Sequence, residues 1–342
     1  MKRALLIGIN YIGQSAELSG CINDIIDMKN LCLSQGYEEI IMIHDSRKII
    51  VEADSVTKSV IPFTQYPKKK NIIAALKWMF SQLKTDDTLL IHYSGHGTQS
   101  IAWSELDGKN EAIVPVDYAY EGIILDNELK NIIVTQNTDM TVKIRCILDC
   151  CHSGTGLDLK YNLRLPRLRD STDDAILNIS KMVKEQVVRE LNKYFDSDIV
   201  DKYMSDKLES EMKLNEIVEW ENNGQEKIVT INNINKRVVQ LPKFDIIMLS
   251  GCDDHQTSAD ATFDNRANGA LTKMFIDLFR SYQSGSMSNS PVVPNVVLNS
   301  SNIPNVAVFL NELRRIMKLN MFTQIPQLSS ESIFTPFVKF DL

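Results

Sequence analysis

Two adjacent cysteines, Cys150 and Cys151, end an apolar run in the segment "ILDCCHSGTG". A cysteine thiolate is a strong nucleophile, so one of these thiols is a candidate for covalent catalysis. If residues 143–150 form a β-strand, successive side chains point to opposite faces of the sheet. Asp149 and Cys151 then share one face, whereas Cys150 points toward the packed interior. We therefore expect Cys151, where the strand must turn, to be the reactive thiol.

A histidine in the segment "IHYSGHGTQ" is the matching candidate for a base. His96 lies just past a strand-like run, between Gly95 and Gly97. Imidazole is the usual acid–base group near neutral pH, and small neighbours leave the Gly97 amide able to donate to a substrate oxyanion, together with the amide of Cys151. A loop histidine beside turn glycines is the alternative interpretation. His92 lies inside the same run, and we expect it to be a core histidine.

Two acidic residues accompany the expected nucleophile. Asp149 shares a face with Cys151, and Asp24 follows the first strand-like run of the chain. A carboxylate beside the thiol would raise the thiol pKa, so Asp149 suits the binding of a cationic substrate group better than activation of the cysteine. Two carboxylates in one pocket repel each other unless a cation neutralises them, which predicts lysine or arginine in the substrate. For Asp24, stabilisation of the first turn of a helix is the alternative role.

The elements that would position these residues are apolar runs separated by helical patterns. Continuous apolar character predicts parallel strands that are covered on both faces. The alternation of strands and helices predicts an α/β fold with a doubly wound, mostly parallel sheet and helices on both faces, whose sites lie at the carboxyl ends of the strands. The runs that we assign to strands are 3–10, 39–45, 87–95, 143–150 and 243–251.

The composition is that of an ordinary globular chain. Of its 342 residues, 44% are hydrophobic and 24% are charged, and the net charge of −7 disfavours non-specific binding to nucleic acid. The first apolar run is too short for a signal peptide or a membrane span. The six cysteines lack disulfide-framework and zinc spacings, so we expect a reduced, cytoplasmic protein with free thiols and no membrane partner.

Charged residues are enriched between residues 160 and 240, and strand-like runs are almost absent there. We predict a partly helical, exposed insertion over 160–240. It would separate a catalytic region over 1–159 from a region over 241–342 that completes the same domain.

Several motifs, in chain order, resemble those of the metacaspases, which are relatives of the caspases. The motifs are "ALLIGINYIG", "ELSGCINDI", "YSGHG", "IVPVDY", "GIILDNEL", "DCCHSG", "LSGCDDHQTSADA", "NGALTKMFIDLF" and "FTQIPQLSS". The resemblance implies a caspase-like fold, with 1–159 as the large-subunit region and 241–342 as the small-subunit region. It also implies a type I-like form without the family's N-terminal Pro-rich region and with a long linker, acting as a monomer.

The resemblance also implies an activity. His96 and Cys151 would form a catalytic dyad, and the amides of Gly97 and Cys151 would form the oxyanion hole. The expected enzyme is a cysteine endopeptidase that cleaves proteins and peptides after Arg or Lys and requires no cofactor for its chemistry. The residues implied for the substrate pocket are Asp24, Asp149, Cys21 and Ser94.

Many metacaspases need calcium, a hard cation that prefers carboxylate oxygens. The residues that the resemblance implies for this site are Asn110, Asp126, Asn127 and Asp158. Two of these four are amides where the family usually has carboxylates, and the acid-rich loop after the histidine is short. Glu111 and Glu128 are candidates to compensate for the lost charge. We therefore predict that calcium is a weakened activator or is not required.

Basic residues in the expected linker are candidates for self-cleavage by an enzyme of this specificity; they are Arg164, Arg167 and Arg169. An ordinary solvated charged stretch is the alternative. Two other functions also stay open at this point. The paired acids disfavour a relative that cleaves after Asp or Asn, and the intact dyad disfavours a caspase-fold scaffold or proteostasis protein without proteolysis.

Overall fold

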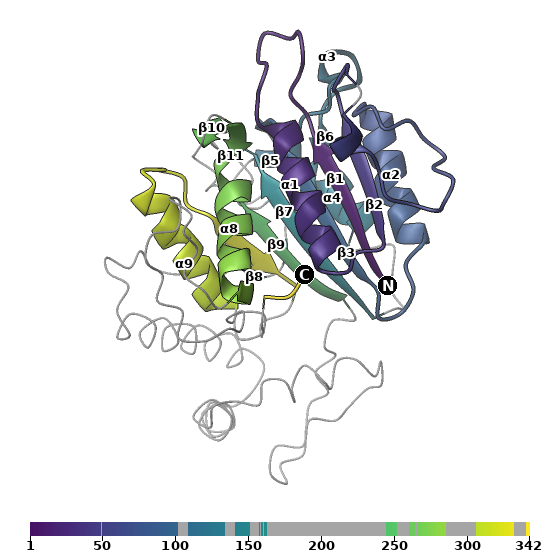
Figure 1. Cartoon of the computed structure of the whole chain (residues 1–342). Helices are drawn as coiled ribbons and strands as arrows, with labels where there is room; N and C mark the ends of the chain where they lie inside the picture. Colours follow the sequence, from purple (N-terminus) through teal and green to yellow (C-terminus); the bar gives the residue numbers. More distant parts are fainter. Residues whose placement is uncertain are drawn as a thin grey trace.

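A seven-stranded sheet forms the centre of the computed structural model (Figure 1). In their order across the sheet the strands are β2 (Glu39–His44), β1 (Lys2–Gly8), β3 (Thr88–Ser94), β7 (Val142–Asp149), β9 (Phe244–Ser250), β12 (Gln327–Ser330) and β8 (Tyr161–Asn162). The first five are parallel to one another, whereas β12 pairs antiparallel with β9 and β8. The predicted mostly parallel sheet is confirmed.

The structure describes residues 1–48, 50–101, 109–133, 141–150, 157, 159, 161–162, 244–251, 260–263, 266–284, 306–331 and 340–342. The predicted insertion over 160–240 lies outside these ranges except for β8, a short strand that the sequence did not predict. Strands β7 and β9, from the two sides of the insertion, lie side by side in the same sheet.

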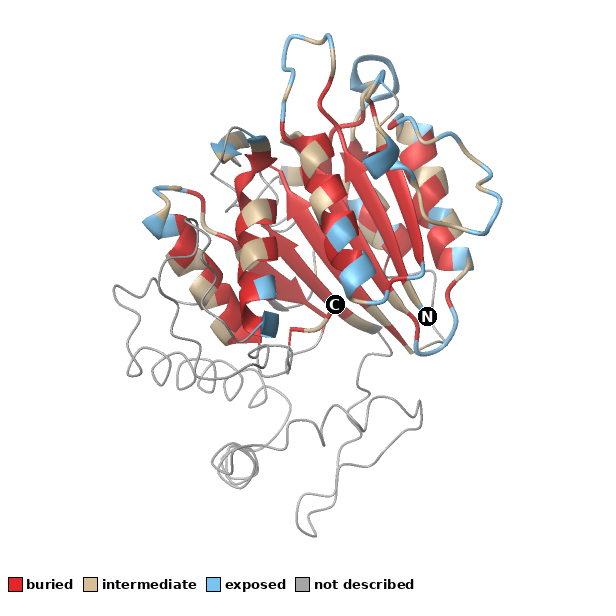
Figure 2. Cartoon of the chain, in the orientation of Figure 1, coloured by how far each residue is buried: buried red, intermediate tan, exposed pale blue. Residues whose placement is uncertain are grey.

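Helices cover both faces of the sheet, as predicted. One face is covered by α1 (Cys21–Ser34), α8 (Ala270–Ser284) and α9 (Val306–Leu319), and the other by α2 (Lys69–Ser81) and α4 (Asp126–Ile133). In β3, Leu90 packs in the first of these two cores, whereas Leu89 and Ile91 pack in the second. This two-sided burial is evident in Figure 2 and explains why the strands are apolar at almost every position.

Smaller elements border the carboxyl ends of the parallel strands. They are β4 (Gly97–Ile101), β5 (Lys109–Ile113) and β6 (Ile124–Leu125), which pair with one another, the hairpin of β10 (Asp260–Phe263) and β11 (Arg266–Gly269), the helix α3 (Tyr118–Glu121) and a 3-10 turn (Val51–Ala53). Strand β4 begins three residues after β3 ends, and β11 leads directly into α8. Among the helices that the structure describes, none combines the length and apolar character that crossing a bilayer requires.

A buried arginine lies near the amino ends of the strands. The side chain of Arg145 in β7 is 2% exposed, and its Nη2 lies 2.7 Å from Asp245 Oδ2 and 2.6 Å from Asp341 Oδ1. Burial by itself would raise the pKa of Asp341, but the charges of Arg145 and Lys143 outweigh this and hold the pKa well below its usual range. Residues on both sides of the insertion thus share one ion-pair network, far from the opposite edge where His96 lies.

Candidate active site

His96 lies in the short connection between β3 and β4, at the carboxyl edge of the sheet. Ser94, the last residue of β3, is in register with Asp149, the last residue of β7. The amide of Gly95 donates to the carbonyl oxygen of Asp149 at 3.4 Å. Strand β7 therefore ends beside the segment that carries His96, as the predicted sheet requires. Cys151 follows two residues later and lies outside the described residues.

One nitrogen of the His96 ring is engaged by the backbone. Nε2 lies 2.7 Å from the carbonyl oxygen of Ala16. A carbonyl oxygen only accepts hydrogen bonds, so Nε2 must carry a proton and donate it. In the neutral ring, Nδ1 then holds the lone pair that a general base requires. This arrangement assigns the tautomer of His96 without reference to its reaction partner.

The loop that supplies the Ala16 carbonyl is held by buried polar side chains. Asp45, just past the end of β2, accepts hydrogen bonds from the amides of Asn10 at 2.9 Å and Ile12 at 3.0 Å. The side chain of Asn10 accepts from the amide of Cys21 at 2.9 Å. These bonds connect the loop to β2 and to the start of α1. Sequence reasoning missed Ala16 and Asp45; the only signal was a carboxylate directly after a buried strand.

The amide of Gly97 is oriented away from its neighbouring strand. Gly97 lies opposite Ile113 in the antiparallel pair of β4 and β5, and the amide of Val114 donates to the carbonyl oxygen of His96 at 3.2 Å. This pattern makes Gly97 and Ile113 a non-hydrogen-bonded pair, in which both N–H groups point away from the partner strand. The backbone geometry thus suits the role in an oxyanion hole that the resemblance implies for Gly97.

The alternation predicted for the end of β7 is seen in the structure. Cys150 is buried in the core between the sheet and α2, whereas Asp149 is buried on the face covered by α1 and α8. His92 is also buried, and its Nδ1 lies 3.1 Å from the carbonyl oxygen of Ile147. Burial lowers the pKa of His92 to about 4. The expected core position of His92 is confirmed, although its Nε2 is buried without a hydrogen-bond partner among the described residues.

Asp24 and Asp149 are brought together, although they lie far apart in the chain. Asp24, in the first turn of α1, accepts a hydrogen bond from the Ser94 hydroxyl at 2.7 Å and from the Gly269 amide at 2.9 Å. Asp149 accepts from both the amide and the hydroxyl of Thr272 at 2.8 Å. The corner between β11 and α8 therefore holds both carboxylates, and Ser94 belongs to the same cluster, as the resemblance implies.

Gly269 marks the point where the two carboxylates meet. A Cβ at this position would overlap Asp149 Oδ2 and would lie 2.7 Å from Asp24 Oδ2. Asp24 is 0% exposed. Burial, and next the charge of Asp149, raise the pKa of Asp24 to about 8. The pair therefore favours a bound proton or a bound cation near neutral pH.

Two further residues belong to this cluster. Cys21 is buried and begins α1, three residues before Asp24 and so on the same side of the helix. Asn268 donates from its side chain to Asp24 at 3.0 Å and to Asp27 at 3.0 Å. The resemblance implies Cys21 as a pocket residue, whereas Asn268, Gly269 and Thr272 were not identified. They occur in the quoted motif "NGALT", but nothing in their residue types indicates a contact with α1.

Three of the four residues implied for calcium, Asn110, Asp126 and Asn127, lie in the described part of the chain, and Asp126 accepts hydrogen bonds from nearby backbone amides. Asp126, at the start of α4, accepts from the amides of Glu111 at 2.9 Å and Asn127 at 2.6 Å. The side-chain oxygen of Asn110 is buried without a hydrogen-bond partner among the described residues. Glu128 lies 3.2 Å from Lys69 Nζ, so its charge is already paired.

The number of carboxylates among the described residues indicates how well they could bind calcium. Asp126 and the two amides are fewer anionic ligands than a hard divalent cation prefers. The buried Glu111, whose backbone amide donates to Asp126, adds one acid beside them. Among the residues that the structure describes, no group of three or more His, Cys, Asp or Glu residues suits a metal ion. Asp158 and the candidate cleavage residues Arg164, Arg167 and Arg169 lie outside the described residues.

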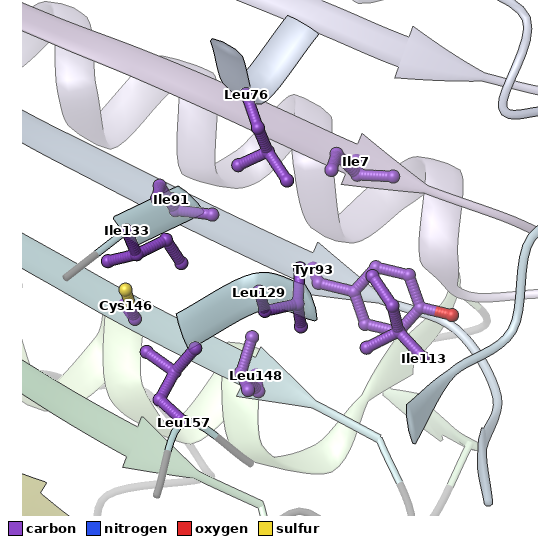
Figure 3. A pocket seen from close by; sticks show the side chains of 10 residues that line it. All are labelled: Ile7, Leu76, Ile91, Tyr93, Ile113, Leu129, Ile133, Cys146, Leu148 and Leu157. Carbon is purple, nitrogen blue, oxygen red and sulfur yellow. The ribbon is translucent and has the colours of Figure 1, made fainter. Parts of the chain in front are cut away.

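An apolar cavity lies below the edge of the sheet that carries His96 (Figure 3). It is a cavity of about 20 Å³ between the sheet and α4, and the residues that line it are Ile7, Leu76, Ile91, Tyr93, Ile113, Leu129, Ile133, Cys146, Leu148 and Leu157. A space of this size holds about one water molecule, and an apolar lining offers such a water no partners. The cavity is therefore a gap in core packing rather than a substrate site.

Comparison with known proteins agrees with the resemblance. The family model described as "Metacaspase, peptidase C14 domain" matches residues 2–160. Metacaspase-1 of Schizosaccharomyces pombe is 30% identical over 334 residues, which cover 96% of this chain and 67% of that protein. Metacaspase-1 of Mycosarcoma maydis is 32% identical over 290 residues, which cover 82% of this chain and 63% of that protein.

Among solved structures, a chain described as "structure of pro-sf-caspase-1" aligns over 96% of this chain and 87% of its own length, with a TM-score of 0.36 and 7% identity. The present chain spans about two thirds of the length of the curated relatives that it matches. The matched residues include the segments before and after the insertion, and they carry the motifs quoted above. On this evidence, the chain belongs to the metacaspase family.

Proposed function

We propose that this chain is a cysteine endopeptidase that cleaves peptide bonds after Arg or Lys, with His96 and Cys151 as its catalytic dyad. The observation that carries the proposal is the buried pair of Asp24 and Asp149 beside the sheet edge that presents His96. Membership of a peptidase family supports the cysteine chemistry, and the acid pair supports the basic specificity.

The reaction follows from the tautomer of His96. Nδ1 takes the proton of the Cys151 thiol, and the sulfur attacks the scissile carbonyl carbon to form a tetrahedral oxyanion. The amides of Gly97 and Cys151 donate to this oxyanion. His96 then gives its proton to the leaving amine, and water hydrolyses the thioester with His96 again acting as base. The carbonyl oxygen of Ala16, 2.7 Å from Nε2, stabilises the imidazolium that forms between these steps.

The specificity follows from the charge of the acid pair. When Asp24 and Asp149 are both ionised in a buried space, they repel each other, and a guanidinium or ammonium group removes this repulsion. An acidic substrate side chain would add a third negative charge to the same space. The acid pair therefore favours Arg and Lys over Asp before the scissile bond.

We extend the proposal to the cofactor, partners and location. Calcium would be at most a weak activator, because Asp126 is the single described carboxylate among the four implied ligands, with Glu111 as one further acid beside it. The partners would be protein and peptide substrates, with Arg164, Arg167 and Arg169 as candidate self-cleavage residues, and the enzyme would act as a monomer. Among the described residues, Cys21, Cys32, Cys146 and Cys150 take part in no disulfide bond, which is consistent with the proposed reducing compartment, the cytoplasm.

A panel of fluorogenic peptides tests the proposal. The peptides differ only in the residue before the scissile bond, which is Arg, Lys, Asp or Asn, and they are assayed with the wild-type protein, Cys151→Ala and His96→Ala. We expect cleavage after Arg and Lys alone, and its loss in both variants. Cleavage after Asp or Asn would overturn the specificity. Absence of cleavage by the folded wild-type protein would favour the scaffold alternative.

A further inference from the structure

Two buried tyrosines hold the main chain of His96. The amide of His96 donates to the hydroxyl oxygen of Tyr11 at 3.0 Å, and the hydroxyl of Tyr93 donates to the carbonyl oxygen of His96 at 2.8 Å. The hydroxyl of Tyr11 in turn donates to the carbonyl oxygen of Val114 at 2.6 Å. The two hydroxyl oxygens lie 3.1 Å apart. Both sides of the His96 peptide are thus bonded to one phenol network.

Tyr11 also contacts the ring of His96. The two ring centroids lie 4.5 Å apart, with an angle of 33° between the ring planes. Tyr11 is 1% exposed, and its φ of 53° lies in the left-handed region, which is unusual for a residue with a large side chain. The amides of Asn10 and Ile12, on either side, are both bonded to Asp45. The strained backbone is therefore held by its neighbours and directs the ring of Tyr11 against that of His96.

The residue before His96 has to be glycine because of the same network. A Cβ at Gly95 would lie 2.7 Å from the hydroxyl oxygen of Tyr93 and 3.1 Å from that of Tyr11. The first distance is shorter than any ordinary contact of a Cβ atom. The glycine in the motif "SGHG" thus leaves room for the two hydroxyl groups, in addition to any role in substrate approach.

We infer that Tyr11 is a positioning residue for His96: its ring and hydroxyl fix the imidazole so that Nε2 stays on the Ala16 carbonyl and Nδ1 keeps the lone pair that a general base requires. The inference rests on the proposed role of His96 as the base. If the imidazole of His96 rotated about its χ angles, Nε2 would lose its contact with the Ala16 carbonyl. The tautomer in which Nδ1 is basic would then no longer be fixed. The Tyr11 ring covers one face of the imidazole and so opposes this rotation.

Tyr11 acts here through its position and not through proton transfer. Burial is the main cause that raises the pKa values of both phenols far above their usual value, so both remain protonated throughout the working pH range. Tyr93 and Val114 are the other groups that face the Tyr11 hydroxyl. The network therefore keeps the same donors and acceptors at every pH at which His96 acts.

The test uses two substitutions of Tyr11 and one matched control. Tyr11→Phe keeps the ring contact and removes the hydroxyl, whereas Tyr11→Leu removes both. Tyr37→Leu is the control, because Tyr37 is also buried but precedes the amino end of β2, at the opposite edge of the sheet from His96. His96→Ala is measured first, and full activity in that variant would overturn the proposed dyad and not only the role of Tyr11.

Three readouts are compared in these variants: kcat and KM for an Arg peptide, the rate of alkylation of Cys151 by iodoacetamide, and the ¹⁵N NMR shifts of the His96 ring. For Tyr11→Leu we expect kcat to fall ~10- to 100-fold with little change in KM, since small misplacements of catalytic groups have effects of this size. Alkylation of Cys151 should slow in parallel, and the NMR shifts should indicate a mixture of tautomers. Tyr11→Phe should lose about two- to fivefold in kcat, and Tyr37→Leu should match the wild type.

A merely structural role gives a different result. Partial unfolding of Tyr11→Leu would expose the buried thiols of Cys146 and Cys150, whose alkylation would then speed up. The inference is overturned if activity falls only together with that exposure. It is also overturned if the folded Tyr11→Leu protein keeps the kcat and the His96 tautomer of the wild type.

Discussion

The carboxylates of Asp24 and Asp149 face one small space, and that space is where residue 269 would carry its Cβ. Asp24 comes from α1 and Asp149 from β7, and the amide of Gly269 donates to Asp24 at 2.9 Å. The glycine thus contributes a hydrogen bond and a missing side chain at the same point. A substrate cation that reaches this space meets two acids at once.

Replacement of Gly269 by alanine should block the pocket. The new methyl group would overlap Asp149 Oδ2 and force the acids apart or fill the space between them. We expect KM for an Arg peptide to rise ~10-fold or more, since a displacement of positioning groups by about an ångström has consequences of at least this size. Alkylation of Cys151 should be unchanged. Gly122→Ala is the control: its positive φ, which Gly269 does not share, makes alanine strained there, but no atom lies near its Cβ position. An equal effect there would refute the steric explanation.

Binding of a basic substrate should release a proton. With its pKa raised to about 8 by burial and by Asp149, Asp24 is mostly protonated at pH 7, and a bound guanidinium displaces that proton. We expect release of close to one proton at pH 7 and much less at pH 9, where Asp24 is already ionised. Calorimetry of an Arg peptide binding to Cys151→Ala, in buffers of different ionisation enthalpy, measures this number. A heat that is independent of the buffer at pH 7 would contradict the prediction.

Stability should depend on pH through the same carboxyl group. The pKa of Asp24 is higher in the folded protein than in the unfolded chain, so its contribution to stability is fully present below about pH 4 and is lost as pH rises through about 8. Asp24→Asn cannot ionise, and its amide can donate to Asp149. We expect this variant to melt at a temperature that rises relative to the wild type between pH 5 and pH 9. A melting difference between the two proteins that stays constant from pH 5 to pH 9 would contradict the prediction.

Rules that depend only on the local sequence predicted the strands of the sheet and the directions of the side chains at the end of β7. Alternation along β7 correctly separated Asp149 from Cys150, because the period of a strand depends only on the strand itself. The pairing of β3 and β7 followed from the order of apolar runs. The acid pair could be anticipated from charge, since Asp24 and Asp149 both lie at the carboxyl edge of a parallel sheet.

The groups that hold these residues could not be anticipated in the same way. The carbonyl oxygen of Ala16 has no residue-type signature, and its contact with His96 depends on the path of a whole loop. The contact of Gly269 with Asp24 joins positions far apart in the chain and depends on how α8 packs against α1. Glu128 could be identified as an acid near the implied calcium site, but not as the partner of Lys69.

Calcium should have little effect on activity. The described residues of the implied site provide one carboxylate, Asp126, and both of its oxygens accept backbone N–H groups. We expect kcat/KM for an Arg peptide to stay within about twofold when calcium is removed with a chelator or added at millimolar concentration. Isothermal titration with calcium alone, on Cys151→Ala to prevent self-cleavage, provides a second measurement. A sharp rise in activity together with a calorimetric binding signal would contradict this prediction.

The ion pairs of Arg145 should respond asymmetrically to substitution. The Arg145 side chain is 2% exposed, whereas those of Asp245 and Asp341 are 25% and 45% exposed. When the arginine is removed, both acids can turn to water, but when the acids are removed, the guanidinium stays buried without a counter-charge. We expect the double variant Asp245→Ala, Asp341→Ala to lose about 3 kcal/mol of unfolding free energy, and Arg145→Met to lose clearly less. Urea unfolding at pH 7 measures both values. The pKa of Asp341 is lowered in the folded protein, so below about pH 4 this acid takes up a proton in the unfolded chain first, and the difference between the variants should shrink. Equal losses for the two variants at pH 7 would show that the exposed acids, and not the buried cation, determine the energy of the network.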